Sequence, residues 1–337
     1  MLNKNLISWI KKQKLINRIN IKRKNKDKLK QWQFDDNSIY HKSKNFFLIK
    51  SFAFKQNKKK WYQPLIIQKE EGVLGIIKKI TSNESYYLLQ AKAEPGNINS
   101  IQISPTVQAT RSNYLRKHGG KKTLFLDYFL KKNKSVKILS NIKLSEQGTR
   151  FLGKKNKNLL VELKRSFLNK PSNFVWLTKK NIKFLLKKRN LLQMDTISIL
   201  SSIISKNKID NPKNDFKFLI FKLNYFKKIL RLDKKLITFS KLKGWKIKNS
   251  IIFNIKKVFF SILFIDVKAN KREVKNWDQP FISDHSTSLN CFIICEIDKT
   301  NHYLLKIVQE PGFDAPKYTS TISEKNFSMK RFKKNKF

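Results

Sequence analysis

The chain has 337 residues, more than one domain usually contains, so we expect two domains with substantial hydrophobic cores. The formal net charge of +51 indicates either binding to nucleic acid or an A/T-rich codon usage, which enriches Lys, Asn, Ile and Phe together. The lysines are dispersed and few aromatic-basic modules occur, so codon usage is the preferred explanation and nucleic acid is not the expected partner.

Cysteine content and hydropathy argue against two further classes of protein. Cys291 and Cys295 are the only cysteines, too few for a disulfide framework, and no further Cys or His pair completes a zinc pattern. The apolar run 258–267 is too short to span a membrane and contains Asp266. We therefore expect a reduced, cytoplasmic protein.

The N-terminal part predicts one helix followed by short strands. Residues 1 to about 30 carry Leu, Ile and Trp at near-helical spacing, which predicts a surface helix. Residues 32–52 predict short strands around a turn at 35–38. The segments 61–64 and 72–77 continue this strand-rich module.

The stretch 86–120 differs from the rest of the chain because it has no lysine between Lys92 and Lys117. Residues 94–97, Glu-Pro-Gly-Asn, have the signature of a type II turn between two strands. Pro105 places the second strand at a sheet edge or at a bulge. Alternation places these polar side chains on one face of the hairpin: Gln90, Lys92, Glu94, Gln102, Ser104, Thr106, Gln108 and Thr110. Two interpretations stay open, a half-solvated surface hairpin and a binding pocket.

Beyond residue 120 the pattern changes from strands to helices. The run 124–130 is apolar enough for a core element, and 159–163 predicts a strand. Thr178 and Asp195 are each expected to cap a helix. The polar segment 206–216 is the expected boundary loop.

The sequence contains an internal repeat. Trp61-Tyr-Gln-Pro64 recurs as Trp277-Asp-Gln-Pro280, and Glu94-Pro-Gly96 recurs at the same offset as Glu310-Pro-Gly312. The second copy has Val308 where the first has Lys92, so its polar row is interrupted. We expect two copies of one strand-rich module, with the active site in the first.

These residues resemble a known family, the NDP-hexose 2,3-dehydratases, which act on nucleoside-diphosphate 4-keto-6-deoxyhexoses. The similarity is carried by LLQAKAEPGNINSIQISPTVQATRSNYLRKHGG, then SEQGTRFLGKKNKN, then FVWLTKKNIKFLLKKRNLLQMDT. In the second copy it continues in REVKNWDQP and QEPGF, so it runs from about residue 30 to residue 315.

The resemblance implies an α+β fold of two tandem Nudix-like modules with flanking helices, and a homodimer. The first module would span residues 1–210 and hold the active site. The second would span 217–337 and be shortened at its C-terminal end. The metal-binding helix of Nudix hydrolases has no counterpart in the sequence, so we expect no metal and no other cofactor.

The reaction that the family carries out defines the chemical groups required. The 4-keto group acidifies the C3 proton, and its removal allows the C2 hydroxyl to leave, without net oxidation or reduction. An enzyme needs a general base, a general acid and a donor to the ketone oxygen. The candidate catalytic residues are Glu94, if burial raises its pKa, and His118, Tyr114 and Lys92. A purely structural role of Glu94 in the turn is the alternative.

A larger set is assigned to binding the nucleotide sugar. Arg111 and Arg150 suit the diphosphate through bidentate hydrogen bonds. The full set of expected binding residues is Trp61, Gln63, Gln90, Asn97, Gln102, Ser104, Thr106, Gln108, Thr110, Arg111, Asn113, Glu146, Gln147 and Arg150. Two other hypotheses remain, a basic RNA-binding protein and a nucleotide-sugar-binding remnant without catalysis.

Overall fold

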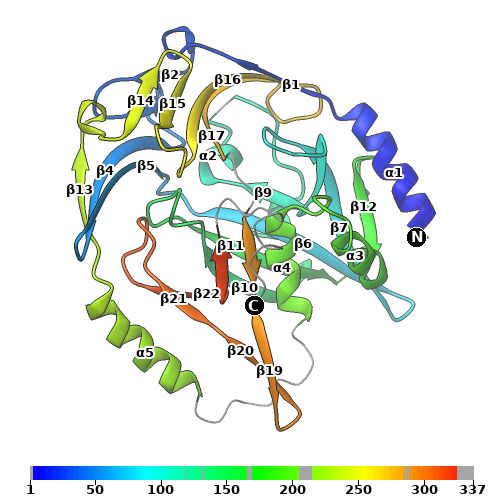
Figure 1. Ribbon diagram of the computed structural model, residues 1–337. Helices are drawn as coiled ribbons and strands as arrows, with labels where there is room; N and C mark the ends of the chain where they lie inside the picture. The colour runs from blue at the N-terminus through cyan, green and yellow to red at the C-terminus, as the bar shows by residue number, and fades with distance from the viewer. Residues whose placement is uncertain are drawn as a thin grey trace, which may run out of the picture.

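The computed structural model describes residues 3–117, 119–130, 133–164, 169–204, 215–284 and 288–324. Strands dominate this part of the chain, and they form three sheets of seven, five and five strands together with three two-stranded ribbons (Figure 1). No helix among the described residues is long and apolar enough to cross a membrane.

The seven-stranded sheet is built from residues 72–178. Its main path runs β10 (Val136–Ser145), β11 (Lys155–Leu163), β6 (Gly72–Thr81), β7 (Glu84–Ala93) and β12 (Phe174–Thr178). Two short strands join it, β8 (Ile101–Ser104) beside β7 and β9 (Val107–Ala109) beside β6. The pairing of β11 with β6 is parallel, and the others are antiparallel.

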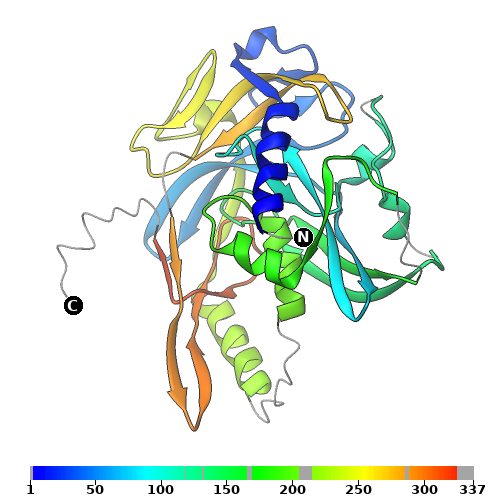
Figure 2. The same ribbon diagram turned by 90° about the vertical axis from the view of Figure 1, so that its right-hand side faces the viewer.

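Three helices cover one face of this sheet: α1 (Asn3–Ile16), α3 (Lys179–Leu186) and α4 (Met194–Ile204) (Figure 2). Their apolar side chains, including Leu6, Ile182 and Ile199, form one buried cluster with Leu89 and Ala91 of β7. The helix capped by Thr178 is confirmed, because this side chain accepts a hydrogen bond from the Asn181 backbone in a capping box.

The opposite face of the sheet is covered by α2 (Arg111–Tyr114) and the short 3-10 helix η2 (Leu126–Tyr128). Leu126 and Phe129 pack there against Val73, Ile77 and Leu88. The expected core element at 124–130 is thus present as a single turn whose inward side chains are buried, while Leu124 and Leu130 are exposed.

The two five-stranded sheets exchange strands between distant parts of the chain. The first consists of β1 (Ile19–Arg23), β14 (Trp245–Lys248), β15 (Ile251–Asn254), β16 (Ser261–Ala269) and β17 (Asn276–Ser283). The second consists of β2 (Trp32–Phe34), β3 (Ile39–His41), β4 (Leu48–Gln56), β5 (Lys59–Ile67) and β13 (Asp233–Ile237). Each sheet therefore takes one strand from the other side of the expected boundary.

The strand exchange corrects one prediction. Residues 19–23 were expected to continue the N-terminal helix, but they form β1 and pair with β16 from Ile19–Ala269 to Arg23–Ile265. The partner lies far along the sequence, so local helical spacing could not reveal it. Between the two sheets, Trp32, Ile39 and Ile49 share a core with Trp245 and Phe260.

Most of the remaining elements lie after the expected boundary. Residues 206–214 of the predicted loop lie outside the described part of the chain, and α5 (Asp215–Ile229) begins within its last residues. The short 3-10 helices η1 (Lys26–Lys28) and η3 (Phe239–Lys241) precede β2 and β14. The C-terminal part forms three ribbons: β18 (Leu289–Cys291) with β23 (Ile322–Glu324), β19 (Ile293–Ile297) with β20 (Thr300–Leu304), and β21 (Lys306–Val308) with β22 (Lys317–Thr319).

Candidate active site

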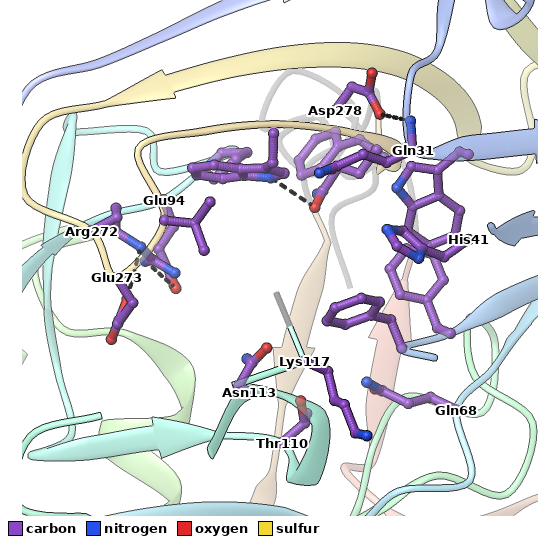
Figure 3. A pocket seen from close by; sticks show the side chains of 18 of the residues that line it. Gln31, His41, Gln68, Glu94, Thr110, Asn113, Lys117, Arg272, Glu273 and Asp278 are labelled. Carbon is purple, nitrogen blue, oxygen red and sulfur yellow. Dashed lines mark hydrogen bonds and ion pairs between the residues drawn. The ribbon is translucent and has the colours of Figure 1, made fainter. Parts of the chain in front are cut away.

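A cavity lies between the seven-stranded sheet and the segment that joins β16 to β17 (Figure 3). Its outer chamber has a volume of about 500 Å³, and an inner chamber of about 200 Å³ adjoins it. Six residues line both chambers and mark where they meet: Gln68, Glu94, Gln108, Thr110, Asn113 and Arg272. In Figure 3, Glu94 and Arg272 lie across the outer chamber from His41.

Aromatic side chains line the outer chamber. Trp32 lies 4.6 Å from Phe47, measured between ring centroids, and 5.4 Å from His41 in an edge-to-face arrangement. Trp277 lines the same chamber from β17 and donates to Gln279 Oε1 at 3.0 Å. Flat aromatic surfaces with a few polar groups between them suit a planar heterocycle such as a nucleobase.

Asp278 holds the two walls of the outer chamber together. Its carboxylate is buried in β17 and accepts hydrogen bonds from the backbone N–H groups of Lys30 at 2.6 Å and Gln31 at 3.1 Å. It also pairs with Lys24 Nζ at 3.2 Å. The loop before Trp32 is thus fixed by a residue from the second copy of the repeat.

The inner chamber is lined by the part of the sheet in which β6 and β7 are separated. The two strands pair only from Ile77–Leu88 to Thr81–Glu84. Beyond that point β9 pairs with β6 and β8 pairs with β7, so residues 101–109 fill the fork between them. Thr106 lies at the branch, where its hydroxyl accepts from the Ile77 N–H at 3.0 Å and donates to the Leu88 carbonyl.

This fork corrects the prediction of one continuous polar face. The strand expected over 101–110 is interrupted at Pro105, which cannot donate a backbone hydrogen bond. Ser104 and Thr106 are therefore buried, whereas Gln108 and Thr110 lie at the chambers. The type II turn is confirmed, since Asn97 N–H donates to the Glu94 carbonyl at 3.2 Å and Gly96 has a φ of +91°.

Glu94 is the centre of an ion-pair cluster. Its Oε1 lies 3.0 Å from Lys92 Nζ and 2.8 Å from Arg272 Nη1, and its Oε2 accepts from Gln193 Nε2 at 3.1 Å. Burial opposes ionisation of this carboxyl, but the charges of Lys92 and Arg272 outweigh burial and lower the pKa to about 2. The raised pKa that a role as general base required of Glu94 is therefore not found, because Arg272, which lies far along the sequence, is beside it.

Asp195 faces the inner chamber, which no sequence pattern indicated. It was expected to cap a helix, but α4 begins one residue earlier and the Asp195 side chain instead accepts from Gln108 Nε2 at 3.0 Å. Gln108 Oε1 in turn accepts from Lys92 Nζ at 3.0 Å. Burial and the negative charges of Glu146 and Glu94 raise the pKa of Asp195 to about 6.

A third carboxyl, that of Glu146, and the buried amine of Lys154 also line the inner chamber. Glu146 accepts a hydrogen bond from Asn156, and burial raises its pKa although Lys154 opposes the shift. Lys154 is 4% exposed and donates to the Glu70 carbonyl, and burial lowers the pKa of its amine. The inner chamber thus combines carboxyl groups of raised and lowered pKa with two amines.

The structure brings only part of the predicted site together. The residues that line one or both chambers are Lys92, Glu94, Gln108, Thr110, Asn113 and Glu146. His118 lies outside the described residues. The other predicted residues line neither chamber, and most of them have structural partners instead.

Several predicted binding residues form hydrogen bonds that hold the fold. Gln63 donates to the Thr149 carbonyl, Gln90 to the Pro105 carbonyl and Gln102 to the Asn190 carbonyl. Asn97 donates to the Lys92 carbonyl inside the turn. The remaining buried ones are Ser104 and Thr106.

The larger predicted side chains also lie elsewhere. Trp61 stacks on Phe54 at 5.4 Å between ring centroids, and Tyr114 packs against the core beneath α2. Arg150 is buried beside Phe260 and pairs with Asp284. Arg111 and Gln147 are exposed to solvent.

Sequence reasoning missed the residues that come from the second copy of the repeat. Arg272, Glu273, Trp277 and Gln279 all line the outer chamber. The sequence does carry a signal for them, because 277–280 repeats the motif 61–64 and 272–280 belongs to the family-like text, but the interrupted polar row of the second copy favoured the first copy as the active one. The cavity therefore extends beyond the expected first module. Among the described residues, no three His, Cys, Asp or Glu side chains are grouped as metal ligands.

Comparison with known proteins identifies the family. The sequence profile of the NDP-hexose 2,3-dehydratases matches residues 3–203 and 222–323. A Streptomyces violaceoruber protein named dTDP-4-dehydro-6-deoxy-α-D-glucopyranose 2,3-dehydratase is 31% identical, over 94% of this chain and 74% of its own length. A Saccharopolyspora spinosa protein of the same name is 30% identical, over 88% of this chain and 66% of its own length. One from Amycolatopsis orientalis is 29% identical, over 93% of this chain and 68% of its own length. The chain belongs to the NDP-hexose 2,3-dehydratase family.

Proposed function

We propose that the substrate is dTDP-4-keto-6-deoxyglucose and that the chain eliminates water across its C2–C3 bond. The reaction would make the protein a carbon-oxygen hydro-lyase. The observation that carries this proposal is the two-chamber cavity, with aromatic walls outside and acid-base groups inside, in a chain that matches the family over nearly its whole length. The names of the three relatives supply the substrate.

The outer chamber is the proposed site of the thymidine diphosphate. Its aromatic walls would stack against the thymine ring, which gains affinity from face-to-face and edge-to-face contact. Lys117 and Arg272 also line this chamber and supply cations for the diphosphate. Arg272 is already engaged with Glu94, so Lys117 is the more available of the two among the described residues.

The inner chamber is the proposed site of the hexose. Lys92 is buried, and its ammonium group contacts Gln108 and Glu94. A third N–H remains for the C4 oxygen, whose negative charge grows as the C3 proton leaves. Thr110 and Asn113 line the passage between the chambers and suit the sugar hydroxyl groups.

Direct assay tests this function. Purified protein is incubated with dTDP-4-keto-6-deoxyglucose, and mass spectrometry follows the loss of one water molecule from the sugar or the release of dTDP from its unstable product. We expect both to depend on enzyme concentration. A folded protein that binds dTDP by calorimetry but yields no product would be a nucleotide-sugar binder, and the catalytic proposal would be wrong.

We also infer that the protein is a homodimer. α5 and the β19–β20 hairpin lie at one end of the molecule (Figures 1 and 2). Both expose large apolar side chains. Phe216 is 68% exposed and Phe221 64%, and Phe292 and Tyr303 add to the apolar surface. Sedimentation equilibrium at the mass of two chains would support the dimer, and the mass of one chain would contradict it.

A further inference from the structure

We propose that Asp195 is the acid-base catalyst of the dehydration: its carboxylate takes the C3 proton and returns it to the departing C2 hydroxyl. This inference rests on the proposed function, because it needs a 4-keto sugar in the inner chamber. It adds a residue that the sequence indicated only as a helix cap.

The backbone around Asp195 is held rigidly against the sheet. Ile103 of β8 accepts hydrogen bonds from the Gln193 N–H at 3.1 Å and from the Thr196 hydroxyl at 2.9 Å. The Ile103 N–H donates to the Leu191 carbonyl at 2.8 Å. The first turn of α4 is thereby fixed to the strand that borders the fork, which positions Asp195 before any substrate enters.

The Asp195 carboxyl has one oxygen engaged and one available. Oδ2 accepts from Gln108 Nε2 at 3.0 Å, and Oδ1 forms no hydrogen bond with the residues that the structure describes. Asp195 lines the inner chamber, so an available oxygen at this position can reach a bound sugar. A general base must have such an open position within hydrogen-bond reach of the proton it removes.

Gln108 connects Asp195 to the proposed electrophile. Its amide accepts from Lys92 Nζ at 3.0 Å and donates to Asp195, so a single amide group separates the ammonium from the carboxyl. When Lys92 binds the C4 ketone oxygen, the adjacent carbon C3 lies beside Asp195. One bound orientation of the sugar therefore brings Lys92 to the C4 oxygen and Asp195 to the C3 proton.

The other carboxyls of the inner chamber are less suited to the task. Both oxygens of Glu94 are engaged by Lys92, Arg272 and Gln193, and its pKa of about 2 makes it a weak base. Glu146 accepts from Asn156 and shares the chamber with Lys154. Of these carboxyls, only Asp195 is joined to Lys92 through one intervening side chain, that of Gln108. Glu146 is therefore the less suited alternative, and the experiment must exclude it.

The proposed step is balanced within the substrate and Asp195. The C3–H bond breaks, its proton moves to the Asp195 carboxylate, and its electron pair forms the enolate at C4. The C2–O bond then breaks, the enolate electrons form the C2–C3 double bond, and Asp195 returns its proton to the leaving hydroxyl as water. Asp195 ends ionised, and no oxidant or reductant takes part.

The test compares four full-length proteins with dTDP-4-keto-6-deoxyglucose: wild type, Asp195→Asn, Glu146→Gln and Asp298→Asn. Asp298 is exposed in the β19–β20 turn with a φ of +51°, which Asn also tolerates, so its variant is the matched control. We expect Asp195→Asn to lower kcat about 100-fold or more while the Kd for dTDP stays within about threefold. Asp298→Asn should keep wild-type kcat.

A pH profile supplies a second measurement that does not depend on how well a variant folds. Wild-type kcat/KM should rise with pH through an inflection near 6, where Asp195 becomes ionised. The charged groups that line the same chamber are Lys92, Glu94, Glu146, Lys154 and Arg272. In Asp195→Asn the inflection should be lost from the residual activity. Glu146→Gln should keep an inflection but move it to lower pH, because the negative charge of Glu146 helps to raise the pKa of Asp195.

The possible results separate this inference from the proposed function. If wild type does not convert the substrate, the proposed function fails and Asp195 has no such role. If wild type is active and Asp195→Asn keeps more than about one tenth of its kcat, only the assignment of Asp195 is wrong. Loss of activity in Glu146→Gln with an active Asp195→Asn would assign the base to Glu146. A wild-type profile without an inflection near 6 would also contradict the inference.

Discussion

Two neighbouring carboxyls in the same cavity are tuned in opposite directions by their contacts. Glu94 is enclosed by two cations, whereas Asp195 is near two other carboxylates and receives one neutral hydrogen bond. The pKa values of about 2 and about 6 follow from these neighbours and not from depth of burial alone. A carboxylate as strongly held as Glu94 is suited to fixing Lys92 and Arg272 in position.

Replacing Glu94 should therefore affect stability in a pH-dependent way. Its pKa is lower in the folded protein than its ordinary value of 4.5, so its stabilisation is complete above pH 4.5 and is lost as pH falls toward 2. We expect Glu94→Gln to lower the free energy of unfolding by about 3 kcal/mol at pH 7, because it leaves Lys92 and Arg272 unpaired. Urea denaturation at several pH values measures this.

The control for this prediction is a carboxyl whose ion pairs lie at the surface. Glu71 contacts Lys143 and Lys157 with exposed side chains. Solvent screens such pairs, so Glu71→Gln should leave the urea midpoint nearly unchanged at pH 7. Equal losses in both variants, or a loss in Glu94→Gln that is unchanged near pH 2, would contradict the ion-pair account.

The fork between β6 and β7 forms one wall of the inner chamber. Leu74 of β6, Lys92 of β7 and Gln108 of β9 line the chamber in the part of the sheet where β6 and β7 no longer pair. One hydroxyl, that of Thr106, satisfies a backbone donor on β6 and a backbone acceptor on β7 at the point where they part. The fork thus depends on a side chain that replaces a missing strand contact.

Thr106→Val tests the role of this hydroxyl. Valine matches threonine in shape, but it leaves the Ile77 N–H and the Leu88 carbonyl buried without their partner. We expect the free energy of unfolding to fall by about 1–3 kcal/mol in chemical denaturation. Thr106→Ser keeps the hydroxyl and should lose less. A valine variant as stable as the serine variant would show that the hydroxyl does not hold the fork.

The elements that the sequence predicted are those with a local cause. The turn at 94–97 follows from Pro95 and Gly96, and the helix after Thr178 follows from its cap. Pro105 likewise marked an edge or a bulge in the second strand of the hairpin. The strand at 19–23 and the pairing of 107–109 with β6 could not be predicted, because each depends on a partner far along the chain. The position of Asp195 was missed for the same reason, since its contact Gln108 lies on another element.

The cavity is assembled from both halves of the chain. Gln31 and Trp32 from the first half and residues of the segment 272–281 from the second line the same chamber as Gln108 of the seven-stranded sheet. The uninterrupted polar row of the first copy favoured its motif, Trp61 to Pro64, as part of the site. The three-dimensional arrangement instead places Trp277 of the second copy at the outer chamber, and Trp61 against Phe54.

The two tryptophans provide a matched test of this arrangement. If the outer chamber holds thymine, Trp277→Leu removes part of the stacking surface and should weaken dTDP binding about tenfold, as measured by calorimetry. Trp61→Leu loses its contact with Phe54 and should lower the unfolding midpoint, but the Kd for dTDP should stay within about threefold. Each tryptophan also donates to the Gln two residues later, so the local hydrogen bond is lost in both variants. Weaker binding in Trp61→Leu with unchanged binding in Trp277→Leu would place the nucleotide at the first copy of the motif and contradict the two-chamber proposal.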